Sequence, residues 1–260
     1  VAGSYTIIGR DSKGCTETLN VTIVSAAGPV PFVDVLTNVA CAGALTGSVT
    51  IGVTGGSPAY QYKLDAGAFQ ASNTFNSVAA GAHTVTVQDA NGCQGTVNFT
   101  ITQPTALTFS TVAVAASCNG VCDGQITVNA SNATPPYQYS SNNGLTFQPS
   151  NILTGLCAGN INVVVKDANG CLANAVVPIT QPPALTSVQG FVDPACYQTP
   201  TGSISFAPVG GTPGYTYSVD NGATFGGVTP VTGLMAGVYN VVVKDSHGCL
   251  YNNSVTLTDP

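Results

Sequence analysis

Charged side chains are scarce in this sequence. They make up 6% of its 260 residues, compared with roughly 25% in an average soluble domain. Threonine, serine, asparagine, glutamine and glycine must therefore supply most of the surface. The formal net charge is −6, and only five residues are Lys or Arg. Binding of nucleic acid or of anionic lipid needs clustered cations, so the composition argues against both kinds of partner.

Long apolar runs, tryptophan and helical patterns are missing as well. No stretch of about 18 uninterrupted apolar residues exists, which argues against a membrane-spanning helix. Methionine occurs once, as Met235. The sequence has no GxSxG element, no phosphate-binding loop and no recurring Ser-His-Asp or Cys-His set. We therefore expect neither an enzyme nor a cofactor-binding site.

One pattern is present along the whole chain: a β-branched run followed by Asp-x-x-Gly-Cys. Its cysteines are Cys15, Cys93, Cys171 and Cys249, so the period is 78 residues. A fixed period indicates a tandem array. Each full copy ends in Thr-Gln-Pro or Thr-Asp-Pro, whose proline predicts a short, semi-rigid linker. The predicted modules are a partial one at 1–26 and full ones at 27–104, 105–182 and 183–260.

Each full module has the pattern of β-strands. An early cysteine stands six residues before a glycine, and apolar residues then alternate with polar ones, as at Val49, Ile51 and Val53. A period of two marks a half-buried strand, and the Asn-Gly type steps between such stretches mark tight turns. About six or seven short strands per module predict an all-β fold, a tandem array of immunoglobulin-like antiparallel β-sandwich modules with a 78-residue repeat.

The nine cysteines indicate an oxidising, extracellular compartment. Zinc is the alternative, but only Cys118 and Cys122 are close to each other in sequence and neither histidine lies near a cysteine pair. The early cysteine and the turn cysteine occur together in every full module, so we expect them to bond within it. Cys15 has no partner in this sequence, and bridges between modules stay open as the alternative. The predicted disulfides are Cys41–Cys93, Cys118–Cys171, Cys122–Cys157 and Cys196–Cys249.

The Asp-x-x-Gly-Cys turn allows two interpretations. Its aspartate can accept hydrogen bonds from the backbone amides of the turn, with the glycine supplying a left-handed residue. Alternatively, Asp89, Asp167 and Asp245 could bind calcium at module joins, although each module has few carboxylates for six to eight oxygen ligands. We favour turn capping. The turn residues are Asp11, Gly14, Asp89, Gly92, Asp167, Gly170, Asp245 and Gly248.

Aromatic and imidazole side chains offer the remaining candidates for binding. Two tyrosines alternate on one strand of each module and could form a sugar-stacking face, although their alternation places at least one of each pair in the core. His83 and His247 stand where the other copies have different residues, which favours structural or solvated roles. The tyrosines are Tyr60, Tyr62, Tyr137, Tyr139, Tyr215 and Tyr217.

Taken in combination, these motifs resemble the SprB-type repeat. They are Cys-x5-Gly, then Gly-Gly-x-Pro-x-Tyr-x-Tyr, then Leu-x-x-Gly-x-Tyr-x-Val-x-Val-x-Asp-x-x-Gly-Cys, and a closing Thr-Gln-Pro. The middle module departs from the pattern with Ser131-Asn132-Ala133 and Ile161, and His83 replaces a tyrosine in the first. The resemblance implies secretion by the type IX route and a filamentous surface adhesin, of the kind found in gliding Bacteroidetes.

We therefore expect a structural segment of a long secreted cell-surface filament or adhesin, with disulfide-stapled modules in a semi-rigid stalk. The expected partners are neighbouring modules, other copies in a fibre and surface polysaccharide. The alternatives are modules that bind carbohydrate or a surface, and the spacer region of a larger secreted enzyme. The partial module at 1–26 adds the hypothesis of completion by strand addition from a neighbouring chain, although a piece cut from a longer chain is the simpler explanation.

Overall fold

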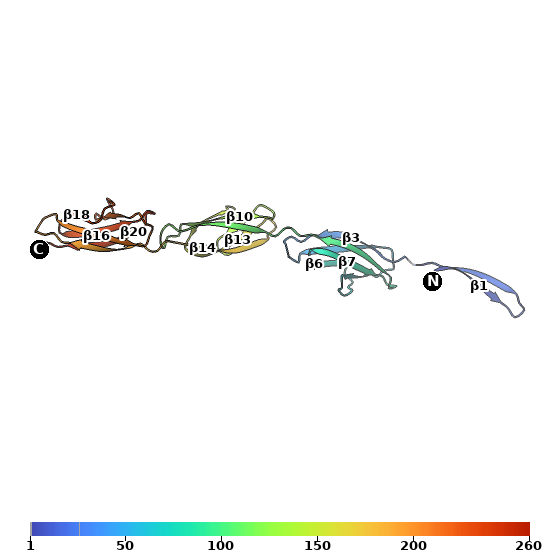
Figure 1. Cartoon of the computed structure of the whole chain (residues 1–260). Helices are drawn as coiled ribbons and strands as arrows, with labels where there is room; N and C mark the ends of the chain where they lie inside the picture. The colour runs from blue at the N-terminus through green and yellow to red at the C-terminus, as the bar shows by residue number, and fades with distance from the viewer. Residues whose placement is uncertain (1, 26) are drawn as a thin grey trace. The chain divides into compact units, whose positions relative to one another are not determined.

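The computed structural model describes residues 2–25 and 27–260, and all regular secondary structure in this part of the chain is β-strand. The chain divides into two compact units, Val1–Ala106 and Leu107–Pro260. No helix in the described part is long and apolar enough to cross a membrane. Figure 1 shows the strands coloured along the chain.

The first unit contains a hairpin and one two-layer sandwich. β1 and β2 pair antiparallel from Gly3–Ile23 to Arg10–Thr16, with side chains that are mostly exposed. The sandwich has one sheet in the order β3-β4-β6 and a second in the order β5-β7-β8. The strands are β1 Gly3–Arg10, β2 Thr16–Ile23, β3 Val30–Thr37, β4 Gly47–Thr54, β5 Gln61–Leu64, β6 Thr74–Val78, β7 Gly81–Gln88 and β8 Gln94–Ile101.

The second unit contains two sandwiches of the same construction. Their sheets have the orders β12-β10-β9 and β11-β13-β14, followed by β15-β16-β18 and β17-β19-β20, and all pairs are antiparallel. The strands are β9 Thr108–Val114, β10 Gly124–Ser131, β11 Gln138–Ser140, β12 Ile152–Leu156, β13 Gly159–Lys166, β14 Leu172–Ile179, β15 Thr186–Val192, β16 Gly202–Val209, β17 Thr216–Ser218, β18 Val231–Leu234, β19 Gly237–Lys244 and β20 Leu250–Leu257.

The sequence pattern explains where the core of each sandwich lies. On β10, Ile126 and Val128 alternate with polar residues and are fully buried. They belong to the same apolar cluster as Val163 and Val165 of the facing sheet. Burial of each such side chain contributes about 1.5–3 kcal/mol. The prediction of an all-β array of antiparallel sandwiches is therefore confirmed, with three strands in each sheet.

Each sandwich has two distinct ends, which decide where its cysteines lie. β10 begins beside the end of β14, because a Cβ on Gly124 would lie 2.8 Å from the Ile179 side chain. We call this the exit end, where the chain leaves the repeat. The turn between β13 and β14 lies at the other end, where the Ala168 amide donates to the Thr134 carbonyl at 2.9 Å. We call this the entry end.

Candidate functional site: a cross-linked join between repeats

The entry end of the last repeat is organised by the buried carboxylate of Asp245, which is 4% exposed. Its Oδ1 accepts the amides of His247 and Cys249, both at 2.9 Å, and its Oδ2 accepts the Thr212 amide at 2.8 Å. The first two bonds shape the turn, and the third ties it to the Gly-Gly turn before β17. One side chain therefore fixes the position of Cys249.

The same arrangement recurs at Asp89 in the first repeat, where the amides of Asn91, Cys93 and Ser57 are accepted at 2.8–3.1 Å. Burial would by itself raise the pKa of the Asp89 carboxyl, but the three amides outweigh it and lower that pKa. The pKa of Asp245 is lowered in the same way, against the effect of burial. These bonds agree with turn capping.

The chain entering the last repeat also packs against this end. The Gly211 amide donates to the Pro183 carbonyl at 2.9 Å. Gly210 has a φ of 78°, and a Cβ there would lie 2.0 Å from the Ala184 carbonyl oxygen. Only glycine permits both this backbone conformation and the close approach. The Gly-Gly step is thus a seat for the linker.

The exit end of the middle repeat is held by its Thr-Gln-Pro signature. The Thr180 carbonyl accepts the Ala116 amide at 2.9 Å, and the Gln181 Oε1 accepts the Gly120 amide at 2.9 Å. These bonds fasten the loop that carries Cys118 to the departing chain. The first repeat has the equivalent bond from Gly43 to Gln103 at 2.8 Å. Sequence reasoning assigned stiffness to the proline and missed this role of the glutamine, although the recurrence of Gln103 and Gln181 was visible.

A disulfide joins these two ends across the repeat boundary. Cys118 of the middle repeat is bonded to Cys249 of the last, with their Cα atoms 5.7 Å apart and 131 residues between them in sequence. The expected pairs Cys118–Cys171 and Cys196–Cys249 are therefore wrong.

The length of the sandwich gives the reason. Cys118 lies at the exit end and Cys171 at the entry end of one repeat. The eight residues of β13 separate these ends, which is about 26 Å at roughly 3.3 Å per residue. A disulfide requires Cα atoms about 4.4–6.8 Å apart. An early cysteine therefore cannot reach the turn cysteine of its own sandwich.

The remaining cysteines divide into bonded and free ones. Cys122 is bonded to Cys157, the pair that the sequence predicted inside the middle repeat. Cys41 and Cys171 are each part of a disulfide. Cys15, Cys93 and Cys196 are free thiols. The expected Cys41–Cys93 pair is consequently wrong, for the same geometric reason, whereas Cys15 is unpaired as expected.

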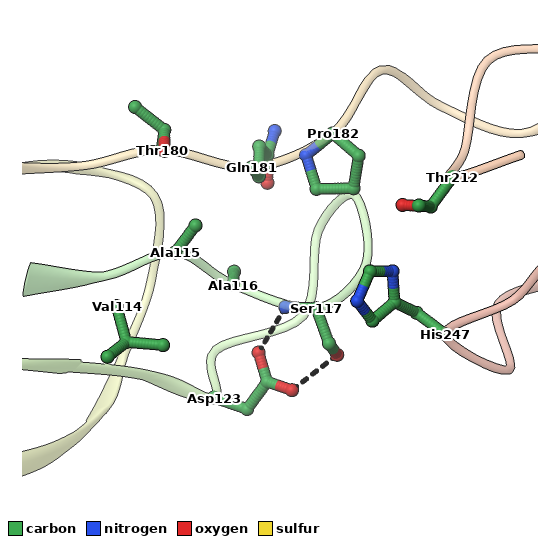
Figure 2. Close-up of a pocket in the computed structure, with 10 residues that line it drawn as sticks. All are labelled: Val114, Ala115, Ala116, Ser117, Asp123, Thr180, Gln181, Pro182, Thr212 and His247. Carbon is green, nitrogen blue, oxygen red and sulfur yellow. Dashed lines mark hydrogen bonds between the residues drawn. The ribbon is translucent and has the colours of Figure 1, made fainter.

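A pocket of about 590 Å³ lies at the join beside the disulfide. Figure 2 shows that Ser117 and Asp123 of the middle repeat line one part of it, while Thr212 and His247 of the last repeat lie across from them. The Asp123 carboxylate accepts the Ser117 amide at 2.9 Å and the Ser117 hydroxyl. These hydrogen bonds to Ser117 lower the pKa of Asp123. The carboxylate thus closes the loop that carries Cys118.

Metal binding has little support at this join. Among the described residues, no three His, Cys, Asp or Glu side chains gather as metal ligands. The carboxylate oxygens of Asp89 and Asp245 are directed to backbone amides instead. This geometry does not add to the calcium alternative.

The six tyrosines do not form an exposed face. Tyr62, Tyr139 and Tyr217 are 8–9% exposed and belong to the three cores. Their partners are half-buried, and each donates its hydroxyl to a carbonyl of the preceding turn. These bonds are Tyr60 to Gly55, Tyr137 to Ala133 and Tyr215 to Gly210, at 2.6–2.9 Å. Stacking on a sugar needs an accessible ring, so the expected binding face is corrected to a structural role.

His83 also has a structural place. Its Nδ1 lies 2.8 Å from the Asp65 carboxylate, its Nε2 lies 3.1 Å from the Ala79 carbonyl, and its ring stacks on Phe99. The hydrogen bond from Asp65 raises the pKa of His83. His247 instead lines the pocket at the join.

Comparison of the sequence with protein families identifies the repeat. The model of the SprB repeat matches residues 33–69, 110–146 and 189–224. This chain carries three SprB repeats. Each match begins on the first strand of a sandwich and ends in the loop after its short middle strand, β5, β11 or β17. The matched part thus includes the early cysteine of every SprB repeat, whereas the turn cysteine lies beyond it.

Among solved structures, similarity is confined to other tandem arrays of β-domains. The eight N-terminal immunoglobulin domains of DSCAM match at 12% identity and a TM-score of 0.37, covering 100% of this chain and 40% of that one. Cadherin domains 3–6 of protocadherin gamma B2 match at 13% identity and a TM-score of 0.28, covering 99% and 84%. The human desmocollin-1 ectodomain matches at 13% and 0.25, covering 98% and 65%. This chain spans two fifths of the DSCAM chain. No curated protein matches the sequence.

Proposed function

We propose that this chain is a non-catalytic structural segment of a long secreted filament or adhesin at the cell surface, in which linked SprB repeats form a semi-rigid stalk. The observation that carries the proposal is the Cys118–Cys249 disulfide, because it fastens one sandwich to the next. An intracellular thiol-reducing environment would not maintain such a bond, so it favours an extracellular location.

Three kinds of contact at the join support stiffness. The Gln181 side chain fastens the exit loop, the Gly210-Gly211 turn seats the linker, and the disulfide connects the two ends. A linker held on both sides has few conformations left, in contrast to a free Gly/Ser chain. Repeats joined in this way would transmit a pull along the chain instead of swivelling.

The resemblance to SprB-type adhesins supplies the biological setting of the proposal. It places the parent protein among surface adhesins of gliding Bacteroidetes that are secreted by the type IX route. Neighbouring repeats are then the first partners of each sandwich, and other copies in a fibre are the next. A carbohydrate-binding role loses its principal candidate, because the tyrosine rings are buried or capped.

Surface labelling of the native organism tests this function. Antibodies raised against residues 27–260 are expected to label intact, unpermeabilised cells along extended threads. Treatment with a protease that cannot enter cells should remove the label. Labelling that appears only after permeabilisation would contradict a surface stalk. An antibody against a cytoplasmic protein serves as the control for cell integrity.

A further inference from the structure

We propose that the early cysteine of every SprB repeat in this chain bonds to the turn cysteine of the repeat that follows, so that Cys41 is bonded to Cys171 as Cys118 is to Cys249. The Cys122–Cys157 disulfide then lies between two cross-repeat bonds and connects them. The result is an interlocked covalent path through the array. This assignment concerns connectivity and holds whether or not the array serves as a surface stalk.

The rule follows from the position of each cysteine in its repeat. Cys118 stands six residues before the first glycine of β10, and Cys41 stands six residues before the first glycine of β4. Cys249 and Cys171 both close an Asp-x-x-Gly-Cys turn and donate their amides to its aspartate at 2.9 and 2.8 Å. The two ends that meet at one join are therefore built identically in the preceding pair of repeats.

The bonding state of the other cysteines provides an independent check. The rule pairs Cys93 with the early cysteine of a preceding repeat and Cys196 with the turn cysteine of a following one. Neither of these partners is among the 260 residues, and neither is that of Cys15. The rule thus leaves Cys15, Cys93 and Cys196 free, and these three are the free thiols of the structure. It also requires Cys41 and Cys171 to be bonded, as they are.

Formation of each bond is an ordinary two-electron oxidation. The two thiols lose two protons and two electrons as the S–S bond forms. The electrons pass to an oxidised dithiol oxidoreductase, whose own disulfide is reduced to two thiols by exchange through a mixed disulfide. The Asp167 and Asp245 turns hold the turn cysteines at the entry ends, where the early cysteine of a preceding repeat reaches them.

The extra disulfide of the middle repeat acquires a specific role in this arrangement. A path from Cys41 crosses to Cys171, follows the backbone for 14 residues to Cys157, crosses to Cys122, and follows four residues to Cys118 before crossing to Cys249. Only these 18 backbone residues lie on the path. Without Cys122–Cys157, the shortest path includes all 53 residues between Cys118 and Cys171.

This role distinguishes cross-repeat bonding from bonding within repeats. If Cys118 were bonded to Cys171, the Cys122–Cys157 bond would lie inside that closed loop and would not affect how far the chain can extend. The same holds if Cys118–Cys249 were the only bond across a join. A mechanical effect of Cys122–Cys157 thus requires both cross-repeat bonds.

Single-molecule stretching of the oxidised full chain, held at its two ends, measures this effect. We expect the double variant Cys122→Ser plus Cys157→Ser to extend farther than the parent by the 35 residues that the bond spans, or about 130 Å at roughly 3.6 Å per residue. The double variant leaves no new thiol to reshuffle the other bonds. Cys15→Ser is the matched control and should leave the extension unchanged.

Peptide mapping without reduction is the second measurement and does not depend on the mechanical behaviour of the variants. It should yield a disulfide-linked peptide pair containing Cys41 and Cys171, with alkylation confined to Cys15, Cys93 and Cys196. Equal extension of parent and double variant, or a mapped Cys41–Cys93 pair, would overturn the proposal. Surface labelling can fail without affecting either result, so the two proposals are tested separately.

Discussion

Single carboxylates fix the shape of each Asp-x-x-Gly-Cys turn. The Asp89 and Asp245 side chains each accept three backbone amides, and both are nearly fully buried. A short side chain that bonds its own turn explains why Asp recurs there. The same atoms also position the cysteine that takes part in the join, so local turn chemistry determines where cross-linking occurs.

Replacing Asp245 should test this role. Asp245→Ala leaves three amides without an acceptor at a buried site and is expected to destabilise the last repeat by about 1–3 kcal/mol. Thermal and urea unfolding of the oxidised chain measure the change. Asp34→Ala, which removes an exposed carboxylate from a strand, is the control and should have little effect. An equal effect of the two substitutions would contradict the capping role.

Acid should weaken the same turns. The pKa of Asp89 and of Asp245 is lowered in the folded chain, so their stabilisation is complete above the unfolded value of about 3.9. It is lost as pH falls through the lower folded value. We expect melting temperatures to be constant above about pH 5 and to fall below about pH 4, with a smaller fall in Asp245→Asn. The reverse ordering would argue against these carboxylates.

His83 predicts the opposite pH dependence in the first repeat. Asp65 raises its pKa, so the protonated pair stabilises the fold fully below the unfolded value of about 6.5, and this contribution is lost as pH rises through the folded value. NMR titration should show His83 above that value. His83→Tyr should abolish the dependence, because the equivalent Tyr239 donates its hydroxyl to the Met235 carbonyl without titrating in this range. Loss of folding in His83→Tyr would contradict the equivalence.

At the scale of elements, the strand pattern was largely readable from the sequence. Alternation at Val49, Ile51 and Val53 predicted β4, and the β-branched runs before each Asp turn predicted β7, β13 and β19. Division of the strands into two sheets of three was not readable, because pairing partners such as Gly124 and Leu156 are far apart in sequence. Glycines at the start of β4, β10 and β16 mark where neighbouring chains approach most closely.

Gly202 offers a test at this scale. A Cβ there would lie 2.9 Å from the Leu234 carbonyl oxygen and 3.0 Å from the Leu257 side chain. Gly202→Ala should therefore overpack the sheet and destabilise the last repeat by about 1–3 kcal/mol. Gly226→Ala is the control in the same repeat, because a Cβ there meets nothing within 4 Å. Unfolding by urea measures both, and similar stabilities would refute the close approach.

At the scale of the whole molecule, the repeats are linked by more than the peptide chain. Bonds inside repeats would leave every linker as a single point of failure, whereas the Cys118–Cys249 bond spans the linker at residues 180–186. A fibre with such bonds tolerates a cut at the join. The small number of Lys and Arg residues reduces the cutting itself, since three of the five lie over phenylalanine rings.

A designed cut tests tolerance at the join. Pro183→Arg places a trypsin site in the exposed linker while keeping the backbone carbonyl that Gly211 uses. After brief digestion, we expect the two pieces to stay together on a non-reducing gel and to separate with reductant. Adding Cys118→Ser should release them without reductant, whereas adding Cys122→Ser should not. Release from Pro183→Arg alone would refute the bond across the join.

The sequence by itself determined the repeat, its strands, its Asp-capped turns and the Cys122–Cys157 pair, because these depend on local periodicity and on residues that differ between copies. The tertiary structure decided the partners of the other cysteines. Co-occurrence of Cys118 and Cys171 in one repeat favoured a bond between them, but antiparallel strands of eight residues place them at opposite ends of the sandwich. Cys118 instead meets Cys249 of the next repeat, since a disulfide forms only between Cα atoms a few ångströms apart.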